Sequence, residues 1–494
     1  MKENKLNQLE SNRLIDPNLA KDMQGKDLTT GSLWKNLLIL SFPIMLSNFM
    51  QTFYNLTDAF WLGKLGENAR NAVSVAGIAF PIIFFLSSFG FGFVVAGTAL
   101  IARYKGAGQF EKIRDVVGQF IIIIVFFSLL YLLFSFFFLD GILRLLQVPD
   151  EIFELAKQYI FIILIGMIFM FIFLSYQSFS HGLGDTVSPM KVQLLSVGLN
   201  VVLDPLFIFG FAFIPRLETI GAAYATLISR VIGAILALIY IKRKMPMIIP
   251  KRANMIPEGK MLKRILRISI PASLGQSMTS FGFLLLQGFV NSFGTVVISV
   301  FSIGNRLNGF FMMPAMGVSN ALSSIVGQNL GAQKVERAER SVKRAMVLVL
   351  IMMGFGSSML FFFGAYLTKF FIADPEVVNI GIRMFRVTSI ASLEFSIIFV
   401  LIGAFNGSGH TRETMILNIV RLWGLRIPFV LLLSGKIMNY ITWQPLQPIF
   451  ELFAKPLAET PYDALWFSMV LSNLIVAIWA FVLYKKGDWK KLRK

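Results

Sequence analysis

The sequence predicts an all-α membrane protein with twelve transmembrane helices, and three observations support this fold class. Hydrophobic residues fill 56% of the 494 positions and charged residues only 15%, against ~25% in soluble proteins. Apolar runs of about 20 residues recur along the whole chain, and each is long enough to cross a ~30 Å hydrocarbon core. The basic residues gather in the short polar segments between these runs.

The apolar runs predict two groups of six spans, separated by the longest basic segment of the chain, around Pro246–Pro257. The predicted spans are 35–62, 72–101, 117–139, 158–181, 190–214, 220–241, 265–292, 295–325, 343–371, 382–405, 414–438 and 463–484. The corresponding domains are a polar N-terminal arm (1–33), an N-lobe (34–241), a linker (242–264), a C-lobe (265–484) and a basic tail (485–494).

The net charge of +19 is interpreted as membrane topology rather than nucleic-acid binding. Basic residues are concentrated in every second loop and in the tail, which is the positive-inside pattern of cytoplasmic segments. We therefore expect a multi-pass protein of the inner or plasma membrane with both termini in the cytoplasm. The arm lacks the apolar core of a signal peptide, so we expect a mobile cytoplasmic segment or, alternatively, an interfacial helix.

The two groups of spans repeat each other at a constant separation of 225 positions. The matched pairs are Gly92 and Gly317, Gly106 and Gly331, Ala107 and Ala332, Gly182 and Gly407, Gly184 and Gly409, Thr186 and Thr411, and Met190 and Met415. Because each group has an even number of spans, both groups enter the membrane in the same direction. This predicts a parallel repeat about an axis along the membrane normal, which is typical of transporters that rock around a central site.

The fifth span contains a buried acid. Asn200 and Asp204 are four residues apart, so they share one face of a helix. Pro205 follows directly and cannot donate a hydrogen bond to the carbonyl of Val201. An aspartate at membrane depth costs roughly 2.5–3.5 kcal/mol on insertion scales and marks a functional site by default.

The first span carries a polar stripe that ends in a second acid. Gln51, Tyr54, Asn55 and Asp58 are spaced at i, i+3, i+4 and i+7, so they lie on one helix face. Gln and Asn also join helices through hydrogen bonds, but a residue with that role need not be charged. The structural alternative for Asp58 is a salt bridge to an arginine of another span. Pro43 should kink this helix.

The second half has buried charges of its own. They are Arg306, Glu394, Arg421 and Arg426. Glu394 has two interpretations: half of an ion pair with one of these arginines, which we favour, or a second charged site that carries protons.

The acids of the first half have no counterparts in the second, and no enzymatic motif accompanies them. The repeat aligns Asp58 and Asp204 with positions near Leu286 and Phe429. Acids that only stabilised the fold would be needed in both halves, so a function explains them better. The chain has no phosphate-binding Gly-x-x-x-x-Gly-Lys-[Ser/Thr] loop, no His/Glu metal constellation and no paired acid and nucleophile. We therefore expect no enzyme activity and no cofactor, and a secondary transporter driven by an ion gradient.

With these features the chain resembles the MATE (multidrug and toxic compound extrusion) family, in the branch with an Asn-x-x-x-Asp-Pro motif on the fifth transmembrane helix. The resemblance covers residues ~35–484 and is specific as a set of motifs. The residues that carry it are Pro43, Gln51-x-x-Tyr54-Asn55-x-x-Asp58, Gly182-x-Gly184-Asp-Thr186, Asn200-x-x-x-Asp204-Pro205, Gly221-Ala-Ala-Tyr-Ala-Thr226 and Arg421-Leu-Trp-x-x-Arg426-Ile-Pro428.

The resemblance implies two six-helix lobes around a central cavity that opens alternately to either side of the membrane. It implies a coupling site for H⁺ or Na⁺ in the N-lobe, whose binding or release bends the first span near Pro43. The implied coupling residues are Asp58, Asn200, Asp204 and Thr226, and the predicted helix kinks lie at Pro43 and Pro205. The implied substrate-cavity residues are Gln51 and Tyr54, to which we add Asn55 and Gln177.

The chain differs from another branch of the family at one position and matches it at a second. That branch has an acid in the seventh span, where this chain has Thr279, and an acid in the tenth span, which Glu394 matches. A second charged coupling site at Glu394 therefore stays open.

These predictions describe a multidrug efflux antiporter that exports bulky, often cationic amphipathic compounds in exchange for H⁺ or Na⁺. Its partners would be small-molecule drugs and the lipid bilayer, without nucleic acid, and we expect a monomer. The alternative is a flippase for a lipid-linked or other specific metabolite. A pyrophosphate substrate requires a cationic cavity, whereas the N-lobe acids favour a cation. A membrane-embedded enzyme is disfavoured because no catalytic constellation accompanies the acids.

Overall fold

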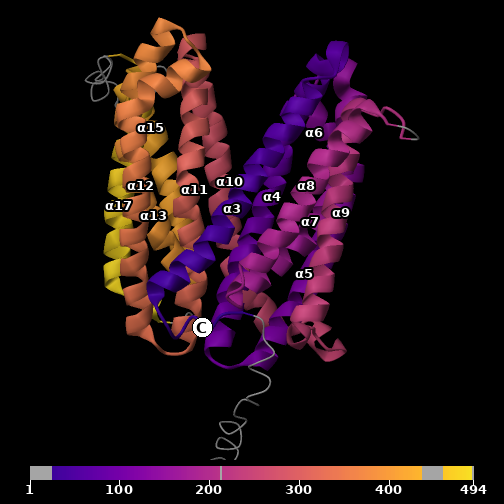
Figure 1. Ribbon diagram of the computed structural model, residues 1–494, viewed down its shortest axis with the longest axis vertical. Helices are drawn as coiled ribbons and strands as arrows, with labels where there is room; N and C mark the ends of the chain where they lie inside the picture. The colour runs from indigo at the N-terminus through magenta and orange to yellow at the C-terminus, as the bar shows by residue number, and fades with distance from the viewer. Residues whose placement is uncertain (1–24, 212–213, 437–459, 492–494) are drawn as a thin grey trace, which may run out of the picture.

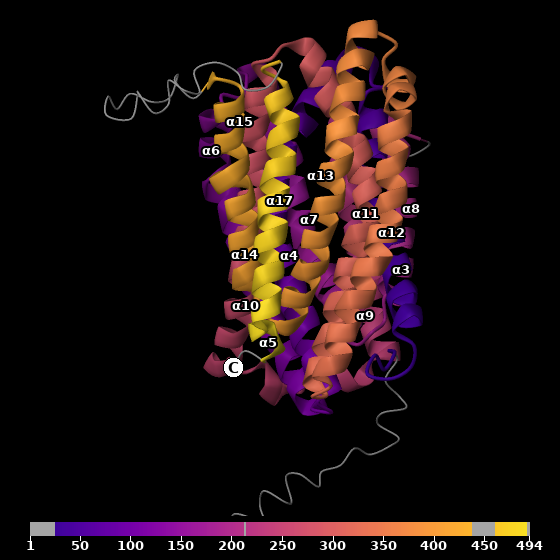
Figure 2. The same cartoon turned by 90° about the vertical axis from the view of Figure 1, so that its left-hand side faces the viewer.

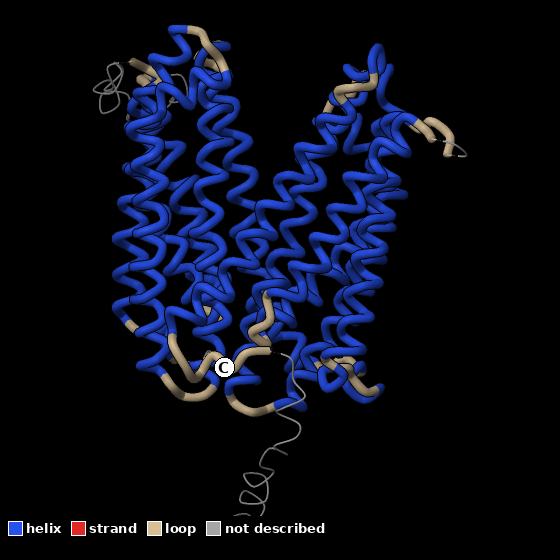
Figure 3. The backbone as a smooth tube through the Cα atoms, in the orientation of Figure 1, coloured by secondary structure: helices blue, strands red, loops and turns tan. Residues whose placement is uncertain are grey.

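The computed structural model describes residues 25–211, 214–436 and 460–491, and its long helices are joined by short loops (Figure 3). Eleven helices among the described residues are long and apolar enough to cross a membrane. The twelfth span is α10 (Gly259–Asn291), whose 33 residues begin with a basic stretch that lowers its apolar character. The predicted all-α, twelve-helix membrane fold is confirmed.

The helices form two lobes. The N-lobe contains α3 (Leu33–Leu62), α4 (Ala69–Gly106), α5 (Phe110–Phe137), the short α6 (Leu139–Leu145), α7 (Asp150–Gly182), α8 (Val187–Phe209) and α9 (Glu218–Lys244). The C-lobe contains α10, α11 (Thr295–Gly331), α12 (Val335–Phe371), α13 (Pro375–Ser408), α14 (Thr411–Ile419), α15 (Ile427–Leu433) and α17 (Asp463–Lys486). Between α14 and α15 the segment Val420–Arg426 is a π-helix that continues the same span.

The lobes meet at one end of the molecule and diverge toward the other (Figure 1). We name the end where they meet, at which α4 ends and α10 begins, the contact end. Turning the molecule by 90° brings the C-lobe helices to the front, with α17 and α13 across the face (Figure 2). The residues between the predicted eleventh and twelfth spans, 439–462, lie mostly outside the described part of the chain.

The helices occupy the places that the apolar runs predicted, but several extend further. The predicted span 72–101 corresponds to α4, which continues to Gly106 through Arg103 and Lys105. Hydropathy marks only the part that lipid can surround, whereas backbone hydrogen bonding continues the helix into the polar region. The span predicted over 190–214 is shorter, because α8 ends at Phe209 and Gly210 adopts a positive φ of 78°.

The repeated Gly-x-Gly motifs follow the fourth span of each lobe. Gly184 lies just beyond α7 with φ 81°, and Gly409 ends α13 with φ 82°. Such left-handed backbone is available to glycine without steric cost, which makes it the usual residue after a helix C-terminus. The repeat in the sequence is thus a repeat of helix-ending geometry.

Glycines also bring the two lobes into backbone contact, where α4 packs on α10 and α11. A Cβ at Gly106 would collide with the carbonyl of Gln328, and a Cβ at Gly331 would collide with the carbonyl of Arg103. Because Arg103 and Gln328 are themselves 225 positions apart, the two contacts are related by the repeat, as in an isologous interface. The lobes therefore meet across a pseudo-twofold axis.

Residues 25–32 form a strap that connects the lobes at the contact end. On the N-lobe side, Lys105 Nζ donates to the carbonyl of Lys26 at 3.3 Å. On the C-lobe side, the N–H of Leu28 donates to Gln328 Oε1 at 3.0 Å, and the Leu28 side chain is fully buried in the C-lobe core. This part of the predicted arm lies against both lobes, and residues 1–24 lie outside the described part of the chain.

Candidate functional site

The helices α3 and α8 bring the two N-lobe aspartates together. Asn200 and Asp204 lie one turn apart on α8, both 0% exposed, and Asn200 Nδ2 donates to Asp204 Oδ1 at 3.1 Å. The carboxyl group of Asp58, from α3, lies within hydrogen-bonding reach of the Asp204 carboxyl group. Two ionised carboxylates are acceptors only and repel each other. Their contact therefore requires a proton between them or a cation beside them.

Two hydroxyl groups connect this carboxylate pair to α9. The Tyr54 hydroxyl lies 2.8 Å from Thr226 Oγ1 and is also within hydrogen-bonding reach of Asp58. Thr226 is 3% exposed. The structure thus gathers all four predicted coupling residues, together with Tyr54, from three helices of the N-lobe.

Three oxygen atoms of this group are buried without a hydrogen-bond partner among the described residues. They are Asp58 Oδ1, Asn200 Oδ1 and Asp204 Oδ2. Buried polar atoms without partners are rare in folded proteins because each one costs its full desolvation. Three acceptors so close together form a site that could accept hydrogen bonds from water or hold a proton or a cation.

A cavity of about 100 Å³ opens beside these residues. Its polar lining includes Gln51, Tyr54, Asn200 and Thr226, so residues predicted for coupling and residues predicted for the substrate line the same space. Gln51 is held at the rim because Gln193 Nε2 donates to its Oε1 at 3.3 Å. A drug-sized ligand needs roughly 300–1,000 Å³, so this cavity suits an ion with a few waters rather than a drug.

The remaining predicted site residues lie elsewhere or outside the description. Gln177 is half-buried on α7 and is not among the residues described as lining the cavity. The side chain of Asn55 lies outside the described part of the structure. Pro43 and Pro205 both lie inside continuous helices, α3 and α8.

Glu394 does not form the ion pair that we favoured, as far as the structure describes its neighbours. Its Oε2 is buried without a hydrogen-bond partner. Of the three arginines predicted to be buried, Arg306 is exposed. The other two have other neighbours: the Arg421 guanidinium lies 4.2 Å from the centre of the Phe395 ring, and Arg426 donates to Asn473 Oδ1 at 2.9 Å. An aromatic face and side-chain oxygens from α17 thus replace the carboxylate as the partners of these cations.

Two residues near the carboxylate pair had no assigned role in the sequence interpretation. Arg230 of α9 lines the cavity and is close enough to Asp58 to attract it electrostatically, while its NH1 donates to the Ile163 carbonyl at 3.4 Å. Tyr159 of α7 lies near both aspartates. Arg230 stands four residues after Thr226, so helical spacing could have identified it; Tyr159 lies on an apolar span without such a signal.

A two-lobed bundle of membrane-spanning helices related by a parallel repeat, with a carboxylate pair inside one lobe, defines the class of the protein as a membrane transporter rather than an enzyme. The comparison with protein families specifies this class. The MatE family model matches residues 43–206 and 271–432, and the chain belongs to this family. The resemblance to the MATE family drawn from the sequence is thereby confirmed at the level of the family.

Named relatives and solved structures agree with this assignment. The chain is 28% identical over 473 residues to the probable multidrug resistance protein YpnP of Bacillus subtilis, covering 95% of this chain and 99% of the relative. It is 26% identical over 401 residues to the multidrug export protein MepA of Staphylococcus aureus, covering 81% and 87%. A solved multidrug resistance MATE family transporter in an outward-facing conformation superimposes with a TM-score of 0.81 at 24% identity, covering 94% and 98%, which shows a shared fold.

Proposed function

We propose that the protein is a multidrug efflux antiporter that exports bulky, often cationic amphipathic compounds in exchange for H⁺ or Na⁺. We place it in the inner or plasma membrane, acting as a monomer with both termini in the cytoplasm. Membership in the MatE family supports transport, and the names of the relatives YpnP and MepA support drugs as substrates.

The observation that carries the coupling proposal is the contact between Asp58 and Asp204. Two carboxylates at hydrogen-bonding distance, one fully buried on Asp204 and one half-buried on Asp58, cannot both remain charged without a proton or a cation. Loss of that occupant would drive the two groups apart, and they are on different helices, α3 and α8. Occupancy of the site is therefore linked to the relative position of these helices, which is what ion-driven conformational change requires.

A Na⁺ ion would find oxygen ligands of the type that hard cations prefer. The Asp58 and Asp204 carboxylates, the Asn200 amide oxygen and the Thr226 hydroxyl form that set. Among the described residues no group of three or more His, Cys, Asp or Glu side chains is arranged to hold a metal. The proposed site thus has only two carboxylates beside neutral oxygens. Because a proton and a Na⁺ would each neutralise these carboxylates, we propose that they occupy the site in competition.

The arrangement of the lobes supports a direction for the opening. The contact end carries the basic residues that flank the spans, including Arg103, Lys105 and Lys334. By the positive-inside rule this end faces the cytoplasm. We propose that the structure has its lobes apart on the outer side.

The test of the coupling proposal is dye efflux from proteoliposomes with an imposed H⁺ or Na⁺ gradient. Asp58→Asn and Asp204→Asn keep the size of the side chain and remove the ionisable group, so each should abolish gradient-driven efflux while the protein remains folded. The matched control is Asp140→Asn, which removes an exposed acid of the same lobe that pairs with Lys157 at 2.8 Å and should leave efflux unchanged. Normal efflux by both site variants would remove the carboxylate pair from the mechanism.

A second measurement distinguishes the coupling ion. Titration of the purified protein with Na⁺, in buffers of differing ionisation enthalpy, counts the protons released on binding. Shared occupancy predicts proton release, weaker Na⁺ binding as the pH falls, and loss of both effects in Asp204→Asn. Na⁺ binding without proton release would refute competition, and absence of Na⁺ binding would leave H⁺ as the coupling ion.

A further inference from the structure

Arg230 brings a positive charge into the cavity beside the carboxylate pair. Among the residues described as lining this cavity of about 100 Å³, Arg230 is the one that carries a charge. Its side chain is half-buried, and a guanidinium group stays positively charged at any physiological pH. The four proposed coupling residues do not account for this cation.

The sequence of α9 places Arg230 on the helix face that carries Thr226. The two residues are four apart, which is one helical turn, and Thr226 Oγ1 lies 2.8 Å from the Tyr54 hydroxyl. Arg230 is also close enough to Asp58 to attract it electrostatically. The attraction acts across a gap, since Asp58 Oδ1 is buried without a hydrogen-bond partner among the described residues.

In the structure the Arg230 guanidinium lies against α7 instead. Its NH1 donates to the Ile163 carbonyl at 3.4 Å, which is longer than the ~2.7–3.2 Å of most N–H···O hydrogen bonds. Gly166 makes room for the side chain, because a Cβ at this position would lie 3.3 Å from NH1 and 3.4 Å from Cδ. A carbonyl inside an α-helix already accepts a backbone hydrogen bond, so this contact is weak and can be exchanged for a stronger one.

The other charged or titratable groups near Arg230 come from three helices. Tyr54 and Asp58 belong to α3, Tyr159 to α7 and Asp204 to α8. The two phenols stay neutral, because an unperturbed phenol ionises only at about pH 10. When both carboxylates are ionised, the guanidinium compensates one negative charge and leaves one. A single monovalent cation therefore neutralises the whole cluster.

The side chains are arranged as in a neutralised site. The contact between Asp58 and Asp204 requires a proton or a cation, and Arg230 then bonds to α7 rather than to Asp58. If the coupling ion leaves, two negative charges remain in a site that is largely shielded from water, which is strongly destabilising without a partner. The guanidinium that already attracts Asp58 can supply that partner.

We propose that Arg230 is an internal counter-cation of the coupling site, which moves from the Ile163 carbonyl to Asp58 when the coupling ion leaves and returns when the ion binds. This inference rests on the proposed ion-coupled transport and adds one residue to the same site. Pairing with Arg230 stabilises the empty site and draws Asp58 away from Asp204, so α3 shifts relative to α8. Because the guanidinium and the coupling ion compete for one carboxylate, the guanidinium promotes release of the ion.

The first arm of the test measures the melting temperature of the purified full-length protein and requires no transport. Na⁺ replaces choline at constant ionic strength in one series, and the pH is lowered without Na⁺ in another; the ion that stabilises the parent is the probe. Stabilisation by a bound ion depends on the ratio of its concentration to its Kd. A unit charge within ~10 Å, at an effective dielectric constant of ~20, changes that Kd by about tenfold or more.

Arg230→Gln should therefore reach a given rise in melting temperature at an ion concentration about tenfold lower than the parent requires. Arg230→Lys keeps the charge and should stay close to the parent. Gly166→Ala should have the opposite effect, because its Cβ crowds the guanidinium on α7 and favours its contact with Asp58, so ion binding weakens.

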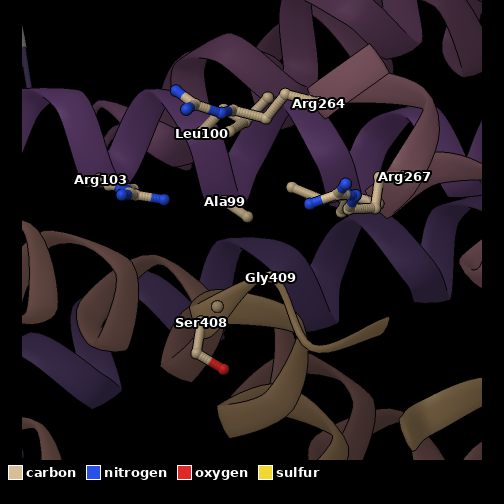
Figure 4. Close-up of a pocket in the computed structure, with 9 residues that line it drawn as sticks. Ala99, Leu100, Arg103, Arg264, Arg267, Ser408 and Gly409 are labelled. Carbon is tan, nitrogen blue, oxygen red and sulfur yellow. The ribbon is translucent and has the colours of Figure 1, made fainter. Parts of the chain in front are cut away.

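Arg264 provides the matched control. It is half-buried like Arg230 and, with Arg103 and Arg267, lines a separate cavity between the lobes at the contact end (Figure 4). This cavity of about 20 Å³ admits about one water molecule. Arg264→Gln loses a hydrogen bond to the Tyr104 hydroxyl, which should lower the melting temperature equally with and without the ion. Its ion dependence should match that of the parent.

The second arm measures dye efflux from proteoliposomes at graded concentrations of the driving ion. Arg230→Gln should lower the half-saturating ion concentration about tenfold and should also lower the maximal rate, because the ion leaves the site more slowly. A residue that only supported the fold would lower the rate without tighter ion binding. Arg230→Lys should restore both values.

Several outcomes would overturn the counter-cation role. Unchanged or weaker ion binding in Arg230→Gln, while the parent shows ion-driven efflux, would refute it and leave ion-coupled transport intact. If Arg230→Gln does not fold, Gly166→Ala decides, and unchanged or tighter ion binding by that variant would refute the role. Absence of gradient-driven efflux from the parent would refute the proposed transport instead, and the melting temperatures would still test Arg230. If neither Na⁺ nor H⁺ stabilises the parent, both proposals fail.

Discussion

Truncation of Leu28 tests whether the strap holds the lobes together. The side chain is 0% exposed within the C-lobe core, while the same strap accepts a hydrogen bond from Lys105 of the N-lobe. Leu→Ala substitutions at buried sites cost about 2–5 kcal/mol. If the strap leaves the C-lobe core when the lobes separate, Leu28→Ala destabilises only the state in which the lobes are together at the contact end. The lower limit of about 2 kcal/mol corresponds to a roughly thirtyfold rise in the open population, at tenfold per 1.4 kcal/mol.

Alkylation of one introduced cysteine measures that population, because the chain contains no cysteine of its own. Ala102 is 0% exposed and lies against Gly327 of the other lobe, so Ala102→Cys should react with a maleimide only when the lobes part. Adding Leu28→Ala should raise the reaction rate roughly thirtyfold. The matched control is Leu38→Ala, which truncates a leucine that is 49% exposed and should leave the rate nearly unchanged.

Two results would refute the reasoning about Leu28. One is an unchanged alkylation rate in a folded Leu28→Ala variant. The packing of the strap would then not be linked to separation of the lobes. The other is an equal rise in the Leu38→Ala control, which would indicate general loosening of the bundle.

Three further predictions concern the lobes and the topology. Ser88→Cys combined with Ser277→Cys should form a disulfide between α4 and α10, because the two serine hydroxyls are hydrogen-bonded to each other. This crosslink should block efflux until a reductant is added. Full activity of the crosslinked protein would contradict rocking at this interface. Glu394→Gln should leave the melting temperature unchanged or raise it, because a buried carboxylate oxygen without a partner gains nothing from its charge; a clear drop would reveal a hidden partner. Cysteines at Lys112 and Lys334 should resist an impermeant thiol reagent in intact cells, and labelling of either from outside would reverse the assigned topology.

The spans and the local geometry of α8 could be predicted from the sequence because they depend on near neighbours. Lipid selects apolar runs of a fixed length, so all twelve helices were found. Helical spacing alone placed Asn200 and Asp204 on one face, and the structure joins them by a hydrogen bond. The contact of Asp58 with Asp204 joins positions 146 apart, and residue spacing carries no information about it; only the family resemblance pointed there.

Other features escaped prediction because a residue type was interpreted by its commonest role. Arg103 was counted as a topology signal of a cytoplasmic loop, although α4 extends past the apolar run and carries this residue into the lobe interface. Leu28 is the one large apolar residue of the strap, 25–32, and composition averaged over the whole arm concealed it. Glu394 was matched to arginines by charge alone. In the structure Arg421 instead lies over the Phe395 ring, and Arg426 donates to the amide oxygen of Asn473.

The glycine contacts at the pseudo-twofold axis bear on the speed at which the lobes can part. Gly106 and Gly331 touch peptide backbone of the opposite lobe rather than side chains, so no ridge is seated in a groove there. Interlocked side chains would have to change rotamers before two surfaces could slide, whereas backbone faces separate without that step. We expect the activation barrier for separation to come chiefly from the strap and the polar contacts around it. A bulkier residue at either glycine would then change the kinetics of opening as much as its equilibrium.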